Sequence, residues 1–300
     1  MGETRSVTHS VTTTAAAADV YGLVADVTRW SVLFGPTIHV DVLERDGSGE
    51  RFRIWATAAG AVANWTSRRT FHPARRRIGF QQERSAPPIA RMSGEWEFRD
   101  RLGGGAEVLL HHEFTTEDGS ADSVDHVLRV LDTNSTAELD GLRRVAELGQ
   151  PVDELVFSFE ETVRADDPRA VYDFIERADE WPRRLDHVRA VELREEPSGV
   201  QWMTMDTLAP DGSAHTTESV RVCDPGRRVL YKQTRPPAAL LGHSGAWTFD
   251  GDRVTSRHTV LLDPGAVADG DLRSARERVT AALRANSAKT LEAALRSRAS

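Results

Sequence analysis

The stretch "NWTSRRTFHP", residues 64–73, places polar residues of catalytic type between aromatic ones. In an extended strand, alternate side chains point to opposite faces. One face then holds Trp65, Ser67, Arg69 and Phe71, while the other face is polar throughout. The aromatic face is predicted to point inward, which places a hydroxyl and a guanidinium inside the fold. Because an unpaired buried charge is costly, such an arginine is normally paired with an acid or lines a cavity that receives a polar ligand.

Two further segments direct polar groups toward the same interior. In "EVLLHHEF", alternation places His112 on the apolar face and His111 on the solvated face. Asn134 follows Leu131 by about one turn on the apolar stripe of a predicted helix. The predicted pocket of this half comprises Trp30, Phe34, Trp65, Ser67, Arg69, Met92, Trp96, His112 and Asn134, with Trp30 and Phe34 at its mouth.

Each of these residues also has a structural interpretation. An inward histidine is commonly a hydrogen-bonded core residue, a buried asparagine can hold its neighbours in register, and tryptophans pack. A structural Arg69 would need an inward carboxylate, and alternation identifies none in this half. We therefore expect substrate oxygens and water, rather than a salt bridge, to hold Arg69, so that its removal costs little stability. Several polar groups inside an aromatic lining favour a ligand site.

The same pattern occurs a second time about 150 residues later, which indicates a duplication. The matches pair "DVYGLVADVTRW" with "AVYDFIERADEW", "SRRTFHP" with "SVRVCDP", Gly94-x-Trp96-x-Phe98 with Gly245-x-Trp247-x-Phe249, His112 with His258, and Asn134 with Asn286. The corresponding pocket residues are Trp181, Ser219, Arg221, Trp247, His258 and Asn286. Thr217 replaces Trp65, so the sequence leaves open whether the second pocket is catalytic or structural.

Each half has the same predicted order of elements. A strand (Val7–Thr13; Glu154–Val163) precedes a helix opened by Asp19 or Asp166, and strands separated by turn signals follow. A long helix, Ser123–Leu148 or Asp271–Arg298, closes each half. The chain is therefore predicted to be α+β, with two tandem helix-grip domains, residues 1–149 and 152–300. In each domain a curved antiparallel sheet wraps around the long C-terminal helix and encloses a pocket.

Composition narrows the function classes. A formal charge of −8 argues against nucleic acid or an anionic membrane as partner, and no stretch is long and apolar enough for a membrane helix. The single cysteine, Cys223, permits no intrachain disulfide and suits a reducing cytoplasm. The glycine-rich "RLGGGAE" is predicted to be a hairpin turn rather than a phosphate loop, and the histidines lack ligand spacing. Neither a cofactor nor a metal is therefore predicted.

With these residues in place, the sequence resembles the two-domain aromatase/cyclases of bacterial type II polyketide synthases, within the START-like or Bet v 1-like helix-grip superfamily. The resemblance extends over nearly the whole chain, and its most specific marker is Trp65-x-Ser67-x-Arg69. It implies that Arg69 is the main catalytic group. It also implies closure and aromatisation of the first ring, commonly between carbons seven and twelve, of a ketoreduced poly-β-ketone bound to an acyl carrier protein.

The residue types agree with this chemistry. A guanidinium in an apolar pocket can stabilise the enolate of an aldol closure without losing its own proton. His112 has the ordinary pKa that suits proton exchange with the departing hydroxyl, and Ser67 can relay that proton. The partners implied are the acyl carrier protein, the ketosynthase with its chain-length factor, and the ketoreductase, and the chain is expected to be monomeric. Arg75–Arg77 and Arg183–Arg184 are candidate basic patches at a pocket mouth.

Two other classes share the predicted fold. One is a carrier that binds a hydrophobic ligand without turnover. The other is a stress-response or co-chaperone module that acts through surface contacts and does not need the internal polar set. Turnover of a poly-β-ketone, and the effect of removing Arg69 on rate as opposed to binding, would separate these classes.

Overall fold

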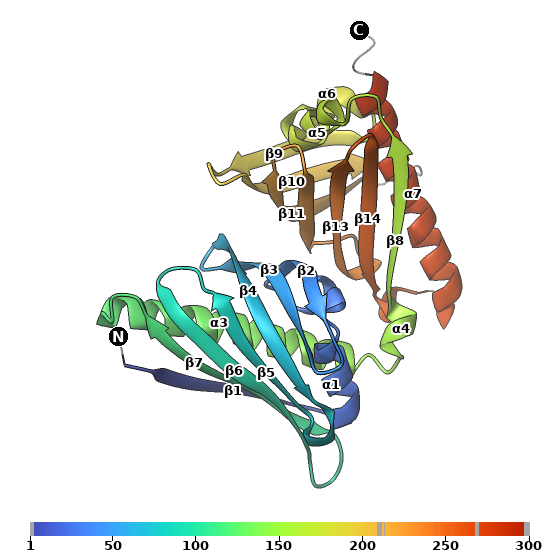
Figure 1. The fold of residues 1–300 in the computed structure, drawn as a ribbon. Coiled ribbons are helices and arrows are strands. Elements are labelled where there is room, and N and C mark those ends of the chain that lie inside the picture. The colour runs from blue at the N-terminus through green and yellow to red at the C-terminus, as the bar shows by residue number, and fades with distance from the viewer. Residues whose placement is uncertain (1–2, 209–211, 213, 268–269, 297–300) are drawn as a thin grey trace. The chain divides into compact units, whose positions relative to one another are not determined.

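The computed structural model describes residues 3–208, 212, 214–267 and 270–296. The chain divides into two compact units, Met1–Val152 and Asp153–Ser300, each of which is described by itself (Figure 1). The predicted turn at residues 209–213 lies almost wholly outside the described residues, and so does the predicted end of the last helix at Arg298.

The first unit is a seven-stranded antiparallel sheet with one long helix. Its sheet has the order β1-β7-β6-β5-β4-β3-β2, so a meander of six strands is closed by β1 beside β7. The elements are β1 (Arg5–Thr13), α1 (Ala17–Ala25), the 3₁₀ turn Val27–Arg29, α2 (Trp30–Leu33), β2 (Thr37–Arg45), β3 (Gly49–Ala58), β4 (Ala61–His72), the 3₁₀ turn Pro73–Arg75, β5 (Arg77–Arg84), β6 (Ile89–Asp100), β7 (Ala106–Thr116) and α3 (Ala121–Ala146).

The second unit repeats this topology with the strand order β8-β14-β13-β12-β11-β10-β9. Its elements are α4 (Val152–Leu155), β8 (Val156–Arg164), α5 (Pro168–Glu176), the 3₁₀ turn Ala178–Glu180, α6 (Trp181–Arg184), β9 (Val188–Glu195), β10 (Val200–Leu208), β11 (Ala214–Asp224), β12 (Arg228–Arg235), β13 (Leu240–Asp250), β14 (Arg253–Leu262), the 3₁₀ turn Pro264–Ala266 and α7 (Leu272–Arg296). The predicted class of two helix-grip folds is confirmed. Asp167, not Asp166, caps α5, because its carboxylate accepts from the Ala170 amide at 3.1 Å.

Helix α3 lies across one face of the first sheet (Figure 1). It begins where the Ser120 hydroxyl accepts from the Ser123 amide, two residues before the predicted start. Its apolar stripe includes Val127, Leu131, Leu139, Leu142 and Val145, all buried. Part of this stripe packs on Met92 and Phe114, which anchors the helix over β6 and β7. The stripe therefore fixes the distance at which α3 stands from the sheet.

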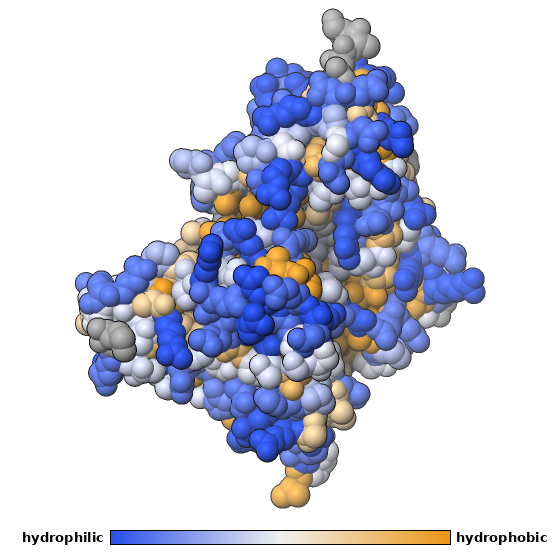
Figure 2. Space-filling model, viewed as in Figure 1, coloured by the Kyte–Doolittle hydropathy of each residue, from blue (hydrophilic) through white to orange (hydrophobic). Residues whose placement is uncertain are grey.

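The surface in view in Figure 2 is largely hydrophilic, with apolar residues in scattered patches. Among the described residues, no helix combines the length and apolar character that crossing a bilayer requires.

The duplicated Gly-x-Trp-x-Phe motif exists because an aromatic ring on the neighbouring strand covers each glycine. A Cβ atom on Gly94 would overlap the His111 carbonyl oxygen and the Phe80 ring. Without that atom, the Phe80 ring reaches His112 on the other side, at 5.4 Å between ring centroids. Gly245 is covered by the Tyr231 ring in the same manner. These glycines therefore bring an aromatic side chain of one strand against a histidine two strands away.

Replacing Gly94 with alanine is therefore expected to lower the free energy of unfolding by about 1–3 kcal/mol, the usual cost of overpacking. The measurement is urea denaturation of the full chain. Gly79→Ala on β5 is the matched control, since no atom lies within 4 Å of its added Cβ. Equal losses for both variants would contradict the packing explanation.

Candidate active site

A cavity of about 180 Å³ lies between the sheet of the first unit and α3. Eight of the nine residues predicted for this pocket line it: Trp30, Trp65, Ser67, Arg69, Met92, Trp96, His112 and Asn134. The exception is Phe34, which does not line the cavity and is packed against Trp30 and Trp96. The sequence therefore predicts most of the lining.

The mouth of the cavity lies opposite the end at which it was predicted. The more exposed lining residues come from the β3–β4 turn, from the loop at residues 86–88, and from His126 and Glu138 of α3. Trp30 and Phe34 are 7% and 1% exposed, so they belong to the closed end. The prediction that they stand at the mouth is wrong because the 3₁₀ turn and α2 fold both rings back into the core.

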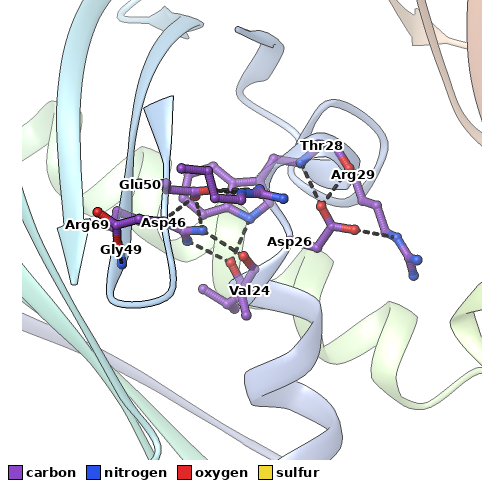
Figure 3. Close-up of polar contacts among 11 residues, drawn as sticks. Val24, Asp26, Thr28, Arg29, Asp46, Gly49, Glu50 and Arg69 are labelled. Atoms are coloured by element: carbon purple, nitrogen blue, oxygen red, sulfur yellow. Dashed lines mark hydrogen bonds and ion pairs between the residues drawn. The ribbon is translucent and has the colours of Figure 1, made fainter. Parts of the chain in front are cut away.

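Arg69 stands at the closed end and is tied to the protein on several sides (Figure 3). Its Nε donates to Glu50 Oε1 at 2.9 Å, and Nη2 donates to the same oxygen. Nη1 donates to the Val24 carbonyl and Nη2 to the Ala25 carbonyl, both at 2.8 Å. These carbonyls end α1, where a cation is favourable. The guanidinium also lies 4.8 Å from the Trp30 ring centroid, so three elements meet at this arginine.

The prediction that no inward carboxylate exists in this half is wrong, because Glu50 is that carboxylate. Its side chain is 0% exposed, and its second oxygen accepts from Arg45 Nε at 2.8 Å. Glu50 is the last residue of the turn signal "RDGSGE", residues 45–50. In β3, however, Glu50 is in phase with the buried Phe52 and Ile54, so alternation could have found it. A salt bridge therefore holds Arg69, contrary to expectation.

Arg69 nevertheless keeps one N–H that no described residue accepts. A guanidinium has five N–H bonds. Four are accounted for by Glu50, Val24 and Ala25, and one on Nη1 has no acceptor among the described residues. Burial lowers the pKa of Arg69 to about 10 although Glu50 opposes this effect, so the group stays cationic at neutral pH. A cationic donor without an acceptor is thus fixed in the wall of the cavity.

The second unit repeats the arginine with a different partner. Arg221 donates from Nη2 to the Ile175 carbonyl at 2.6 Å and from Nη1 to the Glu176 carbonyl at 3.2 Å, at the end of α5. Its Nη1 also donates to Gln201 Oε1 at 2.5 Å. Gln201 stands opposite Arg221 in the sheet as Glu50 stands opposite Arg69. Gln201 donates in turn to Glu195 at 3.3 Å, so an acid replaces Arg45.

His112 is buried, lies against the Phe80 ring, and has no hydrogen-bond partner for Nδ1 among the described residues. Burial lowers the pKa of His112 to about 3, with smaller contributions from His9 and His111. The ring is therefore neutral at pH 7, and the expectation that His112 titrates near its ordinary pKa is wrong. In this state it can accept a proton before it gives one.

Asn134 and Gln82 complete the polar lining. Asn134 Nδ2 donates to the Thr57 carbonyl at 2.9 Å, which ties α3 to the end of β3. Gln82 was missed in the sequence, although it is in phase with Ile78 and Phe80 on β5. It lies opposite Ser67, and its Oε1 is buried without a partner among the described residues. Its Nε2 lies 3.4 Å from the Met92 sulfur.

In the second unit His258 is hydrogen-bonded to polar side chains that were not among the predicted pocket residues. His258 Nδ1 lies 3.0 Å from both the Tyr231 hydroxyl and His243 Nε2, and His258 Nε2 lies 2.9 Å from Ser287. Asn286 is exposed, so the prediction that it faces inward is wrong. Ser287 takes that place because the buried stripe of α7 runs through the next residue.

The remaining predicted residues of this unit are also buried or partly buried. Trp247 lies in the core, and Trp181 packs against it while donating from Nε1 to the Phe174 carbonyl at 3.0 Å. The hydroxyl of Ser219 is buried without a partner among the described residues.

The basic segment Arg75–Arg77 does not form the predicted patch at the mouth. Arg76 pairs with Asp100, and Arg77 pairs with Glu95 at 3.0 Å and Glu97 at 2.7 Å. The segment joins β4 to β5 at the end of these strands away from the mouth-lining residues. In the second unit Arg184 pairs with Glu180, which leaves Arg183 exposed. Among the described residues, no group of three or more acids, histidines or cysteines is arranged to hold a metal ion.

Comparison with known proteins agrees with this architecture. A family model described as "Polyketide cyclase / dehydrase and lipid transport" matches residues 13–130. The actinorhodin polyketide synthase bifunctional cyclase/dehydratase of Streptomyces coelicolor is 48% identical, over 97% of this chain and 95% of its own. The granaticin polyketide synthase bifunctional cyclase/dehydratase of Streptomyces violaceoruber is 44% identical, over 94% and 91%.

Among solved structures, the di-domain ARO/CYC BexL from the BE-7585A biosynthetic pathway superposes with a TM-score of 0.75. It is 44% identical and covers 97% of both chains. Fold and cavity thus define a tandem helix-grip protein with an internal site. The chain belongs to the family of polyketide synthase bifunctional cyclase/dehydratases, which are enzymes.

Arg69→Ala is now expected to be strongly destabilising, by about 3–5 kcal/mol, because it leaves Oε1 of the buried Glu50 carboxylate and the last carbonyls of α1 without their donor. Glu50→Gln is expected to destabilise less, since Gln201 occupies the same place in the second unit, although it leaves Arg45 and Arg69 without a shared acid. Chemical denaturation of the full chain measures both changes.

The double variant Arg45→Glu/Glu50→Gln is the matched control for this pair. It rebuilds the arrangement of Glu195, Gln201 and Arg221, so it should recover part of the stability lost in Glu50→Gln. If the double variant loses more free energy of unfolding than Arg45→Glu and Glu50→Gln lose together, the two units do not stabilise their buried arginine in the same way.

The stability of the second unit should depend on its buried histidines. Burial lowers the pKa of His243 to about 3 and that of His258 to about 4, against an ordinary value near 6.5. Below pH 6.5 these two histidines therefore bind protons in the unfolded chain but not in the folded chain. Stability should be full above that pH and fall toward pH 4, by up to about 1.4 kcal/mol per pH unit for each histidine.

Urea midpoints measured between pH 7 and 4 test this dependence. His243→Met, which introduces the residue found at the equivalent position of the first unit, should give a shallower slope. His72→Gln, at an exposed position, should leave the slope unchanged. Identical slopes for all three proteins would refute the assignment.

Proposed function

We propose that the protein closes the first ring of a poly-β-ketone held on an acyl carrier protein and dehydrates it to an aromatic ring. The proposed site is the cavity of the N-terminal domain, residues 1–149. The observation that carries the proposal is the free N–H of cationic Arg69 in a cavity that also contains Ser67 and neutral His112. Family membership and the relatives' shared description support it.

Arg69, His112 and Ser67 are the proposed catalytic residues. His112 removes a proton from a methylene carbon between two carbonyls, a step that needs the neutral ring. The resulting enolate carbon attacks a second carbonyl carbon, and the N–H of Arg69 stabilises the oxygen that gains charge. The His112 imidazolium then gives its proton to the alkoxide, which becomes a hydroxyl, and the ring is neutral again. Arg69 stays cationic throughout, so it is not the source of that proton.

Dehydration reuses the same groups. His112 removes a second proton next to the remaining carbonyl, and its imidazolium then gives a proton to the departing hydroxyl, which leaves as water. Ser67 relays the proton where the distance is too great for direct transfer. Loss of water and enolisation of the remaining carbonyls give the aromatic ring, so no oxidant is required.

The aromatic lining selects one conformer of a flexible chain. Trp30, Trp65 and Trp96 are rigid walls from three elements, and orientation in such a cavity can lower the barrier by several kcal/mol, up to about 7–11 in well-aligned systems. Closure between carbons seven and twelve of a ketoreduced chain is the regiochemistry that we propose. The ketosynthase, chain-length factor and ketoreductase as further partners, a monomeric state and a cytoplasmic location stay predictions.

The C-terminal domain, residues 152–300, carries Ser219, Arg221 and His258 in equivalent positions. Its histidine is already hydrogen-bonded by the protein, as the contacts of His258 with Tyr231 and His243 show. We therefore assign the reaction to the first domain.

Reconstitution with a minimal synthase, with and without its ketoreductase, tests the proposal. We expect a shift from spontaneously cyclised products to one product with an aromatic first ring, mainly in the mixture with the ketoreductase. Ser67→Ala and His112→Gln should each reduce this product by about 10²-fold or more, because both residues are proposed to transfer the proton. Retained binding with an unchanged product profile would instead identify a carrier.

A further inference from the structure

Five positions around the histidine are structurally equivalent in the two units, and two of them differ in a way that points to a ligand. Gln82 lies opposite Ser67 as Gln233 lies opposite Ser219. Phe80 and His112 flank Gly94, and Tyr231 and His258 flank Gly245. Met92 precedes Gly94 by two residues, as His243 precedes Gly245. The glutamine and the histidine are therefore common to both units, whereas the two residues beside them change.

In the second unit, the changed residues satisfy the common ones. Gln233 Oε1 accepts from His243 Nδ1 at 2.8 Å. His258 Nδ1 lies 3.0 Å from the Tyr231 hydroxyl and 3.0 Å from His243 Nε2. A closed hydrogen-bond network thus occupies this place in the fold.

In the first unit, Phe80 and Met92 stand where Tyr231 and His243 stand, and neither can donate a hydrogen bond. Gln82 Oε1 and His112 Nδ1 are consequently both buried without a partner among the described residues. Both side chains line the cavity. Buried polar atoms are nearly always paired, so two unpaired ones that face the same cavity call for a ligand.

We propose that Gln82 and His112 form a subsite that binds a hydroxyl group which the substrate carries into the cavity. This inference rests on the proposed function and names the oxygen that the site recognises. The amide nitrogen of Gln82 faces the Met92 sulfur, a weak acceptor, which leaves the amide oxygen for the ligand. That oxygen can only accept a hydrogen bond.

A hydroxyl can hydrogen-bond to either atom, and a ketone oxygen cannot pair with Gln82. The hydroxyl can donate its hydrogen to Gln82, or its oxygen can accept from His112 if Nδ1 carries the proton. If Nδ1 is bare, the hydroxyl donates to either acceptor. A ketone oxygen can at best accept from His112 and leaves Gln82 unpaired in every tautomer. Sites built for a substrate hydroxyl reject analogues that cannot donate, so the subsite distinguishes a reduced position from an unreduced one.

Binding of 2-tetralol and 2-tetralone, which differ only in a hydroxyl and a ketone oxygen, tests the subsite without turnover. Isothermal titration with the full chain should give 2-tetralol a Kd about 10-fold or more below that of 2-tetralone. Gln82→Leu should bring the ratio close to one. Gln81→Leu is the matched control, since Gln81 is the exposed neighbour on the same strand, and it should keep the ratio.

The variant Phe80→Tyr/Met92→His installs the network of the second unit and offers an independent reading. It should remain folded, as that network already exists in this fold, and it should lose the preference for the alcohol. A ratio near one in the unaltered protein, or a ratio unaffected by Gln82→Leu in folded protein, would overturn the subsite.

Turnover separates this inference from the proposed function. In the reconstituted system, Gln82→Leu should lower kcat/KM for the ketoreduced chain by about 10-fold and leave the unreduced chain unaffected. Equal effects on both chains would also overturn the subsite. If the unaltered protein does not change the products at all, the proposed function fails, while the tetralol ratio still decides the subsite.

Discussion

A single guanidinium joins the elements that enclose the cavity. Arg69 of β4 is bound to Glu50 of β3 and to the last carbonyls of α1, and it lies on the Trp30 ring. Helix termini leave carbonyls without partners, and a cation at that place satisfies them and complements the helix dipole. The sheet, the short helix and the closed end of the cavity therefore depend on one side chain. Arg69 was predicted for its chemistry, but it also holds these elements together. This structural role explains why the second unit retains an arginine at the equivalent position.

The two units show how one framework supports two interiors. Both have an arginine at the end of the short helix, a glycine beneath an aromatic ring, and a histidine beside that ring. The first unit surrounds its histidine with Phe80 and Met92. Gln82 Oε1 and His112 Nδ1 therefore have no partner among the described residues, and both side chains line the cavity. The second surrounds His258 with groups that bind it. Apolar replacements thus create a binding site here, because they expose the hydrogen-bonding capacity of their neighbours.

Sequence patterns located the framework better than the site. The repeat and the helical stripes predicted both units, and strand alternation predicted that Trp65, Ser67, Arg69 and His112 face one interior. Glu50 was missed because it is both the last residue of the turn signal "RDGSGE" and the second residue of β3. Asn286 was predicted where Ser287 lies, since a shift of one residue rotates a helical position by about 100°. The burial of Trp30 depends on how α2 folds back, and the low pKa of His112 depends on the packing around it, so neither is encoded in local spacing.

Because of the position of the mouth, strand β4 runs along the depth of the cavity. Ala63, Trp65, Ser67 and Arg69 line the cavity in order, from the open end to the closed one. At about 3.3 Å per residue, these four residues span roughly 20 Å. A chain that enters through the mouth while its other end stays attached outside reaches Arg69 with its free end first. The length of chain between the attachment and the reacting carbons is then set by the strand itself. In such a fold the depth that the chain reaches sets the regiochemistry. Exchanging Ala63, Trp65 or Ser67 therefore changes that depth while Arg69 still holds the strand in place.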